Sequence, residues 1–481
     1  MSRAEKLPLF GERTLVCFAA LYRTLNLVLV QTWFVPDEYW QTLEPAHRLA
    51  FGYGYLTWEW HEALRSYSYP CIFAAVYKIL TYIGLDNHLF MVNVPKVICC
   101  VLAAFADRQL YKLASQLFDQ KTACWTMFVY YSNWFQFFCA PRTLLNTVES
   151  ALVVISSSYL CELSKSRLPG QKKLLLAATL SAWAIVIRPT SILLLVPIWL
   201  RYVRLSNIRH YAAATGAGLL VAISTAFVDR ICYESWTFPL WNFVQFNLIR
   251  GGSAMFGSHA WHWYMTSGIP SVFLFQIVLI LSGIWKSEQN RFFCNVSVLY
   301  IFVHSLIAHK ELRFLLPTVP LLSIYGGYFL ANHASAIKTW RKWAFAFLVL
   351  PNVVLALFTG LIHQRGVMDV TKFLNKEAQT NHVHAAVPMR FLTCMPEKLS
   401  WLGYVDEADN FHKEPMAWFE RELSAAGLRP THIVLYEKMA LLLADLLRKE
   451  KYSLTKTFFN TYFPQGIRQS NKILLYERIK S

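Results

Sequence analysis

Two short segments of this chain concentrate ionisable side chains between long apolar runs. Residues 34–40 (FVPDEYW) place Asp37 and Glu38 among aromatic side chains, and residues 309–314 (HKELRF) hold four ionisable residues in five positions. A carboxylate beside aromatic side chains at a membrane surface is partly desolvated, which suits it to remove a proton from a reacting hydroxyl. We therefore predict that Asp37 and Glu38 are catalytic. A helix cap or an interfacial anchor is the alternative role for such an aspartate.

The second segment supplies positive charge. Charged groups this close to hydrocarbon are costly and are usually functional. His309, Lys310 and Arg313 could hold a phosphate group just outside the bilayer, and Arg142, at a span end on the same side, is a further candidate. The alternative is a snorkelling cluster neutralised by Glu311.

Seven residues are candidates for binding an acceptor or a sugar. They are Trp58, Glu59, Trp60 and Arg65 after the first segment, and His259, Trp261 and Trp263 in a later polar stretch. Aromatic ring faces can stack on carbohydrate, but the same residues are typical of an aromatic belt at the membrane surface. The sequence leaves both interpretations open.

No metal site is predicted. The ten cysteines form neither a CxxC pair nor a metal-ligand spacing, and most lie inside apolar runs. They are expected to serve as small buried apolar side chains.

The composition places these segments in a polytopic α-helical membrane protein. Of 481 residues 55% are hydrophobic and only 16% are charged, with a mean hydropathy of +0.33. A soluble domain averages about 25% charged residues. The net charge of +17 could indicate nucleic-acid binding, but the lysines and arginines fall in short clusters between apolar runs, which argues against it.

Eleven apolar stretches are predicted to cross the bilayer. They are Thr14–Trp33, Pro95–Leu113, Ala123–Cys139, Leu145–Leu163, Leu174–Ile187, Ile192–Leu200, Tyr211–Val228, Ile269–Trp285, Phe292–Ala308, Leu315–Leu330 and Trp343–Leu361. A twelfth, Cys71–Ile83, is short and carries Lys78. If it does not cross, all six Lys/Arg clusters between the spans fall on one side, as cytosolic loops require. We therefore expect it to lie along the membrane surface.

This topology puts the N-terminus in the cytosol and the polar loops on the opposite side. Those loops are 34–94, 140–144, 188–191, 229–268 and 309–313. Residues 1–361 are predicted to form the transmembrane catalytic domain, with 34–94 as its first non-cytosolic loop. Residues 362–481 are predicted to form a small domain of mixed α/β structure on the same side as the loops, with a strand at His432–Tyr436 and a helix at Lys438–Arg448. The only N-x-S/T sequon, at Asn295, falls at the cytosolic mouth of a span and should carry no glycan.

The motifs resemble those of a known family. FVPDEYWQTLEPAH (34–47), GYGYLTWEW (52–60) and LRSYSYP (64–70) resemble the first lumenal loop of the endoplasmic-reticulum mannosyltransferases that use dolichyl-phosphate mannose, and HKELRF resembles their second hallmark. Softer motifs resemble the members that add the third mannose of the glycosylphosphatidylinositol (GPI) precursor. These are PRTLLNTVES (141–150), IRPTS (187–191), GSHAWHWY (257–264), HQRGVMDV (363–370), PMRFLTC (388–394) and DEADNF (406–411).

The resemblance implies a GT-C fold and an inverting transfer. Its substrates would be a lipid-linked donor, dolichyl-phosphate mannose, and a GPI glycolipid whose second mannose becomes α-1,2-linked. Asp37 matches the acidic loop residue proposed as general base, while His309, Lys310 and Arg313 match the second motif. The resemblance implies no metal or other cofactor and an active site facing the lumen, and no protein partner is evident. The chain departs from the family by being short around Asn375–Pro388 and before its first span.

Two other functions stay open at this stage. An α-1,2-mannosyltransferase of the dolichol-linked N-glycan precursor would share both motifs. A secondary transporter would instead place ionisable residues near the middle of the membrane and show repeats between its halves, whereas here the polar residues concentrate in loops on one side.

Overall fold

A computed structural model describes residues 12–165, 170–203, 208–288, 290–333, 341–380, 414–425, 430–464 and 469–479. The motifs at 388–394 and 406–411 lie outside these residues. So do Cys394, most of the segment Asn375–Pro388, and several cations of the predicted cytosolic clusters. Residue contacts divide the chain into two units. Unit 1 comprises Met1–Val28 and Pro36–Ala356, and unit 2 comprises Leu29–Val35 and Leu357–Ser481.

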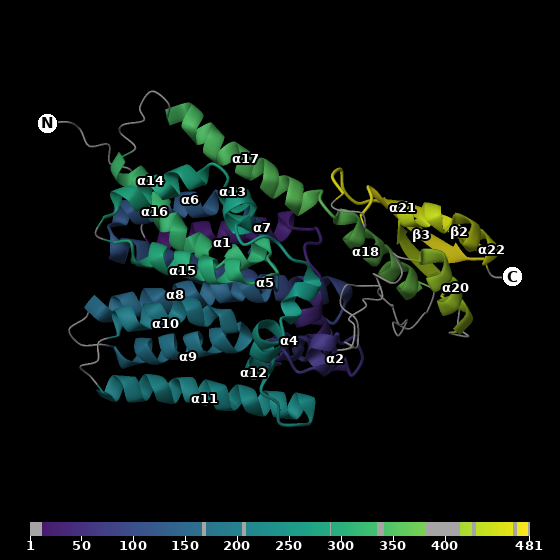
Figure 1. Ribbon diagram of the computed structural model, residues 1–481, viewed down its shortest axis with the longest axis horizontal. Coiled ribbons are helices and arrows are strands. Elements are labelled where there is room, and N and C mark those ends of the chain that lie inside the picture. The colour runs from purple at the N-terminus through teal and green to yellow at the C-terminus, as the bar shows by residue number, and fades with distance from the viewer. Residues whose placement is uncertain are drawn as a thin grey trace. The chain divides into compact units, whose positions relative to one another are not determined.

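Unit 1 is helical (Figure 1). Its longer helices are α1 (Glu12–Leu29), α4 (Pro70–Tyr82), α5 (His88–Leu117), α6 (Gln120–Tyr131), α8 (Leu145–Lys165), α9 (Gln171–Ile187), α10 (Ile192–Tyr202), α11 (Ile208–Tyr233), α14 (Gln276–Lys286), α15 (Phe292–Leu306), α16 (Thr318–His333) and α17 (Arg341–Leu361). Its short helices are α2 (Glu44–Phe51), α3 (Trp58–His61), α7 (Trp134–Cys139), α12 (Pro239–Val244) and α13 (Ile269–Phe273).

Each predicted span corresponds to a helix or to two consecutive helices. Two of them are broken rather than straight. Ala123–Cys139 becomes α6 and α7, separated at Asn133, whose side chain caps α7 by accepting from the Gln136 N–H at 2.9 Å. Ile269–Trp285 becomes α13 and α14, with a bend of 105°. The bend falls at Leu274, whose φ of 48° cannot continue a helix.

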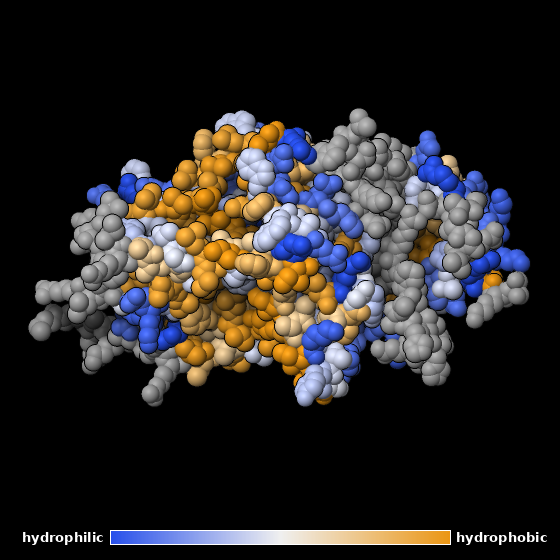
Figure 2. All heavy atoms as spheres, turned by 90° about the horizontal axis from the view of Figure 1, so that it is seen from below, coloured by the Kyte–Doolittle hydropathy of each residue, from blue (hydrophilic) through white to orange (hydrophobic). Residues whose placement is uncertain are grey.

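Among the described residues, three helices are long and apolar enough to cross a membrane by themselves: His88–Leu117, Tyr211–Tyr233 and Ala346–Lys376. The bent pair would make a fourth. The number of eleven crossings therefore stays a prediction. Hydrophobic side chains nevertheless cover a broad area of the surface (Figure 2). The exposed apolar residues of unit 1 include Leu21 at 70% and Leu200 at 79%. A surface of this kind is stable in lipid rather than in water.

Helix α4 has 13 residues. At 1.5 Å per residue it is about 20 Å long, which is less than the roughly 30 Å of the hydrocarbon core. Because α10, a predicted crossing, has only 11 residues, length does not distinguish α4 from the crossings, and the placement of Cys71–Ile83 along the membrane surface stays a prediction.

Glycines allow α16 to lie close to its neighbours. A Cβ on Gly283 of α14 would come within 1.9 Å of the Tyr325 carbonyl oxygen, and one on Gly327 would come within 2.4 Å of the Thr126 backbone nitrogen in α6. Small residues at such contacts let helix backbones approach closely, as is usual in membrane bundles.

Unit 2 contains a three-stranded antiparallel sheet in the order β1-β3-β2. The strands are β1 (His432–Tyr436), β2 (Tyr452–Phe459) and β3 (Lys472–Arg478), and the helices are α18 (Arg365–Thr380), α20 (Pro415–Ala425), α21 (Glu437–Leu442) and α22 (Ala444–Lys449). The strand predicted at His432–Tyr436 is confirmed. The predicted helix Lys438–Arg448 is present as the consecutive helices α21 and α22, whereas β2 and β3 were not predicted.

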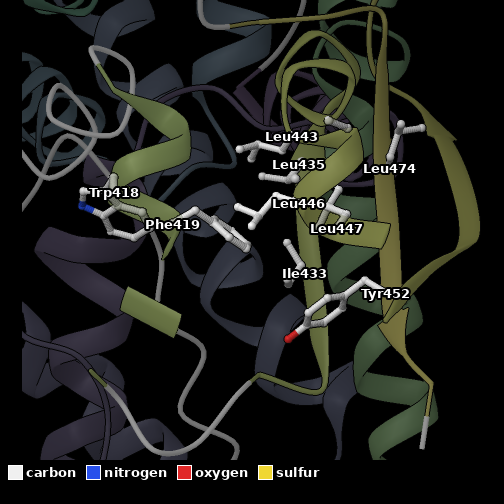
Figure 3. Packing of buried hydrophobic residues seen from close by; sticks show 10 residues of the cluster. Trp418, Phe419, Ile433, Leu435, Leu443, Leu446, Leu447, Tyr452 and Leu474 are labelled. Atoms are coloured by element: carbon white, nitrogen blue, oxygen red, sulfur yellow. The ribbon is translucent and has the colours of Figure 1, made fainter. Parts of the chain in front are cut away.

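Both faces of this sheet are covered. In β3, Ile473 and Leu475 belong to a buried cluster with Val370 of α18. Leu474 between them belongs to another cluster, with Trp418 and Leu446 (Figure 3). Alternate side chains of a strand point to opposite faces. The continuous apolar run in β3 is therefore explained by burial on both sides.

Candidate active site

Asp37 lies in the turn that leads from the first span into α2. The N–H groups of Tyr39 and Trp40 donate to the Pro36 carbonyl oxygen at 2.9 and 3.1 Å, and a π-helical turn, Tyr39–Leu43, follows. This turn brings Gln41 back beside Asp37. Gln41 Nε2 donates to Asp37 Oδ2 at 2.6 Å and to Glu59 Oε2 at 3.1 Å.

The same carboxylate contacts the second motif. Arg313 Nη1 donates to Asp37 Oδ2 at 2.5 Å, although the two residues are 276 positions apart. Both side chains are largely buried, with 11% of Asp37 and 8% of Arg313 exposed. The structure therefore joins the predicted base to a predicted phosphate ligand in one ion pair.

Arg313 is oriented by Glu311. Arg313 Nε and Nη2 donate to the two Glu311 carboxylate oxygens at 2.7 and 2.5 Å, in a forked geometry that only arginine can make. Burial opposes ionisation of Glu311, yet the Arg313 guanidinium and the hydrogen bonds with His309 and Arg313 outweigh it and lower the pKa of Glu311 to about 2. Burial likewise opposes the charge on Arg313, but Asp37 and Glu311 raise its pKa above the ordinary value. The guanidinium is therefore a permanent cation with a fixed plane.

The other two basic residues of the motif, His309 and Lys310, make separate contacts. His309 Nε2 is 2.8 Å from Glu311 Oε1. Lys310 Nζ donates to the backbone carbonyl oxygens of His259 and Ile307 at 3.0 and 2.6 Å, and burial lowers the pKa of Lys310. These contacts attach the motif to the 229–268 loop.

Glu38 points to a different partner from that of Asp37. Arg142 Nη1 donates to Glu38 Oε2 at 2.7 Å, and the Arg142 guanidinium lies 4.1 Å from the Phe138 ring centroid. The Thr143 hydroxyl donates to the Glu38 carbonyl oxygen at 3.0 Å. Adjacent carboxylates thus each face an arginine from a different loop.

The residues of the first loop that are predicted to bind the acceptor sugar are mostly buried. Trp58 and Trp60 are only 1% and 2% exposed, and Trp60 Nε1 donates to the Trp40 carbonyl oxygen at 2.9 Å. Arg65 Nη2 donates to Glu59 Oε1 at 2.7 Å. In this structure the two tryptophans pack against protein, and the Glu59–Arg65 pair connects to Asp37 through Gln41.

The later tryptophans are more accessible. The His259 and Trp263 rings stack, with centroids 4.9 Å apart and planes at 25°. His259 is exposed, Trp263 is half-buried, and Trp261 is 71% exposed. These rings lie next to the HKELRF segment in the structure, since His259 N–H donates to the Ala308 carbonyl oxygen at 3.0 Å.

A further buried ion pair lies close to this cluster. Arg188 Nε is 3.1 Å from Glu149 Oε2, and the Ser191 hydroxyl donates to Glu149 Oε1 at 3.0 Å. The Arg188 guanidinium is 5.3 Å from the ring centroid of Phe314. All five predicted non-cytosolic loops therefore meet at one end of unit 1.

Gln41 is the residue that sequence reasoning missed. It bridges Asp37 and Glu59, and its spacing of four residues from Asp37 within a helical turn is the signal that could have identified it. The pairing of Asp37 with Arg313 gave no local signal.

The chain is similar to known mannosyltransferases over most of its length. Residues 14–397 match the model of the Alg9-like mannosyltransferase family. The chain is 37% identical to the human protein named GPI alpha-1,2-mannosyltransferase 3, covering 98% of this chain and 88% of the human one. It is 31% identical to mannosyltransferase APTG1 of Arabidopsis thaliana, over 97% of this chain and 92% of the relative.

Solved structures show the same fold at low sequence identity. ArnT from Cupriavidus metallidurans, solved with undecaprenyl phosphate, matches 97% of this chain and 98% of its own with a TM-score of 0.57 and 12% identity. The oligosaccharyltransferase AglB from Archaeoglobus fulgidus, solved with an inhibitory peptide and a dolichol-phosphate, matches 96% of this chain and 75% of its own with a TM-score of 0.52 and 11% identity. The fold is thus that of the membrane-embedded GT-C glycosyltransferases, and by its family match and its relatives this chain belongs to the Alg9-like mannosyltransferase family.

Proposed function

We propose that this enzyme transfers mannose from dolichyl-phosphate mannose to the second mannose of the GPI precursor, forming an α-1,2 linkage. The observation that carries the proposal is the nearly full-length similarity to relatives named GPI alpha-1,2-mannosyltransferase 3, including those of human, cow and zebrafish. We place the reaction at the lumenal face of the endoplasmic-reticulum membrane, because the contacting loops are those on the side opposite the predicted cytosolic clusters.

The geometry supports a single displacement. The acceptor hydroxyl attacks C1 of the donor mannose, and the new C1–O bond forms as the bond from C1 to the phosphate oxygen breaks. The hydroxyl proton passes to Asp37 Oδ. The electron pair leaves with dolichyl phosphate, so inversion needs one base and no covalent intermediate.

Arg313 would have two partners in this reaction. In the structure its Nη1 holds Asp37 at 2.5 Å. A donor phosphate binding to Arg313 would compete for that contact, because the phosphodiester and the carboxylate are both anionic acceptors for the same guanidinium. The base would then be released toward the acceptor only when donor is bound. Arg313 would also stabilise the charge that develops on the leaving phosphate.

The remaining predicted residues complete this assignment. Lys310, His309 and Arg142 would surround the phosphate, while His259, Trp261 and Trp263 would contact sugar. The proposal includes no bound metal, because the arginines and Lys310 can supply the positive charge that phosphate departure requires.

The acceptor is tested by lipid analysis of cells that lack the enzyme. We expect a GPI precursor with two mannoses to accumulate, and expression of the wild-type chain to restore the third mannose. A truncated N-glycan precursor with normal GPI lipids would instead identify the enzyme as an α-1,2-mannosyltransferase of the dolichol-linked pathway.

The base is tested by Asp37→Asn in a reconstituted assay with dolichyl-phosphate mannose. We expect a loss of about 10²-fold or more in transfer rate, the usual contribution of a positioned base, with normal membrane insertion. The matched control is Asp86→Asn, an exposed aspartate of the same loop, which should keep full activity. Near-normal transfer by the Asp37 variant would remove it from the mechanism.

A further inference from the structure

Two cysteines from distant parts of the chain meet beside the first loop. Cys71 is the second residue of α4, and Cys232 is the next-to-last residue of α11. Both are free, partly accessible thiols, and each lies close enough to the other for an electrostatic interaction between the two side chains. The two residues are 161 positions apart in the sequence, so only the fold brings them together.

Independent contacts hold this junction in place. Asp229 Oδ1, one turn before Cys232, accepts hydrogen bonds from the Tyr67 N–H at 2.7 Å and from the Ser66 hydroxyl at 3.1 Å. The Tyr233 hydroxyl donates to the Arg65 carbonyl oxygen at 2.7 Å. The chain on both sides of the thiols is therefore fixed, and the thiol contact does not depend on a mobile segment.

We propose that Cys71 and Cys232 form a disulfide that links the first loop to the end of α11. The inference goes beyond the proposed function but rests on its placement of these loops in the lumen, where disulfides form. The step is thiol–disulfide exchange. The Cys71 and Cys232 thiols lose two protons and two electrons to an external disulfide, that of an oxidoreductase or of oxidised glutathione, which is reduced to two thiols as the Sγ–Sγ bond forms.

The bond would restrain the active site through the residues next to it. Arg65, six positions before Cys71, holds Glu59 at 2.7 Å, and Glu59 accepts from Gln41, which donates to Asp37. A covalent link across 161 residues also limits the unfolded chain strongly, because the stabilisation by a disulfide grows with the length of the loop it closes.

Peptide mass spectrometry tests the link directly. Microsomes containing the full chain are denatured in N-ethylmaleimide without reductant, and the protein is digested with trypsin. We expect the peptides Ser66–Lys78 and Ile231–Arg250 to appear as one species, lighter by two hydrogens than their sum, that separates on reduction. Recovery of both peptides fully alkylated, without any linked species, would overturn the proposal.

Thermal unfolding of the purified chain in detergent provides the second test. Reductant should lower the unfolding midpoint of the wild type by several degrees but leave that of the Cys71→Ser/Cys232→Ser variant unchanged. The matched control is Cys17→Ser/Cys124→Ser, which should stay as sensitive to reductant as the wild type. A wild-type midpoint that does not respond to reductant would contradict the link.

Neither the linked peptide nor the unfolding midpoint depends on mannose transfer. The disulfide and the proposed function can therefore be disproved independently of each other. A linked species in a protein that transfers no mannose would remove the proposed function alone. Full transfer by a chain with both thiols alkylated would remove the disulfide alone.

Discussion

At the scale of single residues, Asp37 is defined by its two donors. Arg313 and Gln41 both donate to Oδ2, at 2.5 and 2.6 Å. Among the described residues, these two hydrogen bonds to the Asp37 side chain both reach the same oxygen. In the proposed reaction, Oδ1 would therefore be the oxygen open to the acceptor hydroxyl before donor binding releases Oδ2.

Gln41 should act as a positioning residue. Gln41→Leu keeps the size of the side chain but removes the donor shared by Asp37 and Glu59, so the two carboxylates lose the group that separates them. We expect the turnover number to fall about 10-fold, which corresponds to about 1.4 kcal/mol, with little change in the KM for donor. Steady-state kinetics measures the two separately.

The control for this variant is Gln171→Leu, an exposed position at the start of α9. A rise in donor KM at constant turnover number in Gln41→Leu would show that Gln41 binds substrate rather than orienting Asp37.

Glu311 gives a prediction for pH dependence. Its pKa is lowered from 4.5 to about 2 in the folded protein. Its ionised form therefore stabilises the native state fully above pH 4.5, and this contribution is lost as the pH falls from 4.5 toward 2. Glu311→Gln should unfold at a lower temperature than the wild type by a constant margin between pH 8 and pH 5, and the margin should shrink below pH 4.

Thermal unfolding in detergent across this pH range tests the statement. If the difference in unfolding temperature between the wild type and Glu311→Gln already shrinks between pH 7 and pH 5, the Glu311–Arg313 pair does not hold Glu311 ionised.

At the scale of secondary-structure elements, α1 is anchored to α5 by a buried ion pair. Arg23 Nε and Nη2 donate to the two oxygens of Asp107 at 2.9 and 2.5 Å, and both side chains are at most 2% exposed. The Tyr131 hydroxyl donates to Asp107, and Arg23 Nη1 donates to Asn26 and Gln136. Arg23 and Asn26 are both buried and therefore face the interior of the bundle.

Removing one residue of the Arg23–Asp107 pair should lower the stability of the protein more than removing both. Arg23→Met leaves Asp107 charged and unpaired inside the bundle, at a cost of about 3–5 kcal/mol. The double variant Arg23→Met/Asp107→Leu should have a free energy of unfolding closer to that of the wild type. Unfolding of the detergent-solubilised proteins measures the difference, with the exposed Arg201→Met as control.

Equal stability of Arg23→Met and the wild type would show that the pair contributes nothing. A double variant less stable than either single variant would show that the pair stabilises beyond simple charge compensation.

At the scale of the whole molecule, the orientation of the protein in the membrane predicts whether Asn295 of the N-x-S/T sequon is glycosylated. Asn295 is exposed near the start of α15. His309, three residues beyond the end of the same helix, belongs to the active-site cluster, so Asn295 lies toward the opposite end of α15. If that cluster faces the lumen, Asn295 faces the cytosol, away from the glycosylation machinery.

We therefore expect the chain from native membranes to keep its electrophoretic mobility after treatment with a peptide N-glycosidase. An engineered sequon in the 229–268 loop serves as the positive control and should gain a glycan. A glycan on Asn295 would reverse the orientation.

The sequence by itself determined the class of protein and the chemical types at the site. Apolar runs form helices because a backbone in lipid must satisfy its own hydrogen bonds. Each predicted span is found as a helix or a broken helix for that reason. The Lys/Arg clusters between the apolar runs follow from the preference of positive charge for cytosolic loops. The strand at His432–Tyr436 was also readable, because local β-branched and apolar residues favour it.

Only the tertiary structure decided which charges meet. The contacts of Asp37 with Arg313, of Glu38 with Arg142 and of Cys71 with Cys232 join residues more than 100 positions apart. Hydropathy sets how long a helix is but not which loop its end approaches. Other features likewise depend on packing partners distant in the sequence. They are the bend at Leu274, the burial of Trp58 and Trp60, and the strands β2 and β3. The proposal that Asp37 and HKELRF act together rests on this packing.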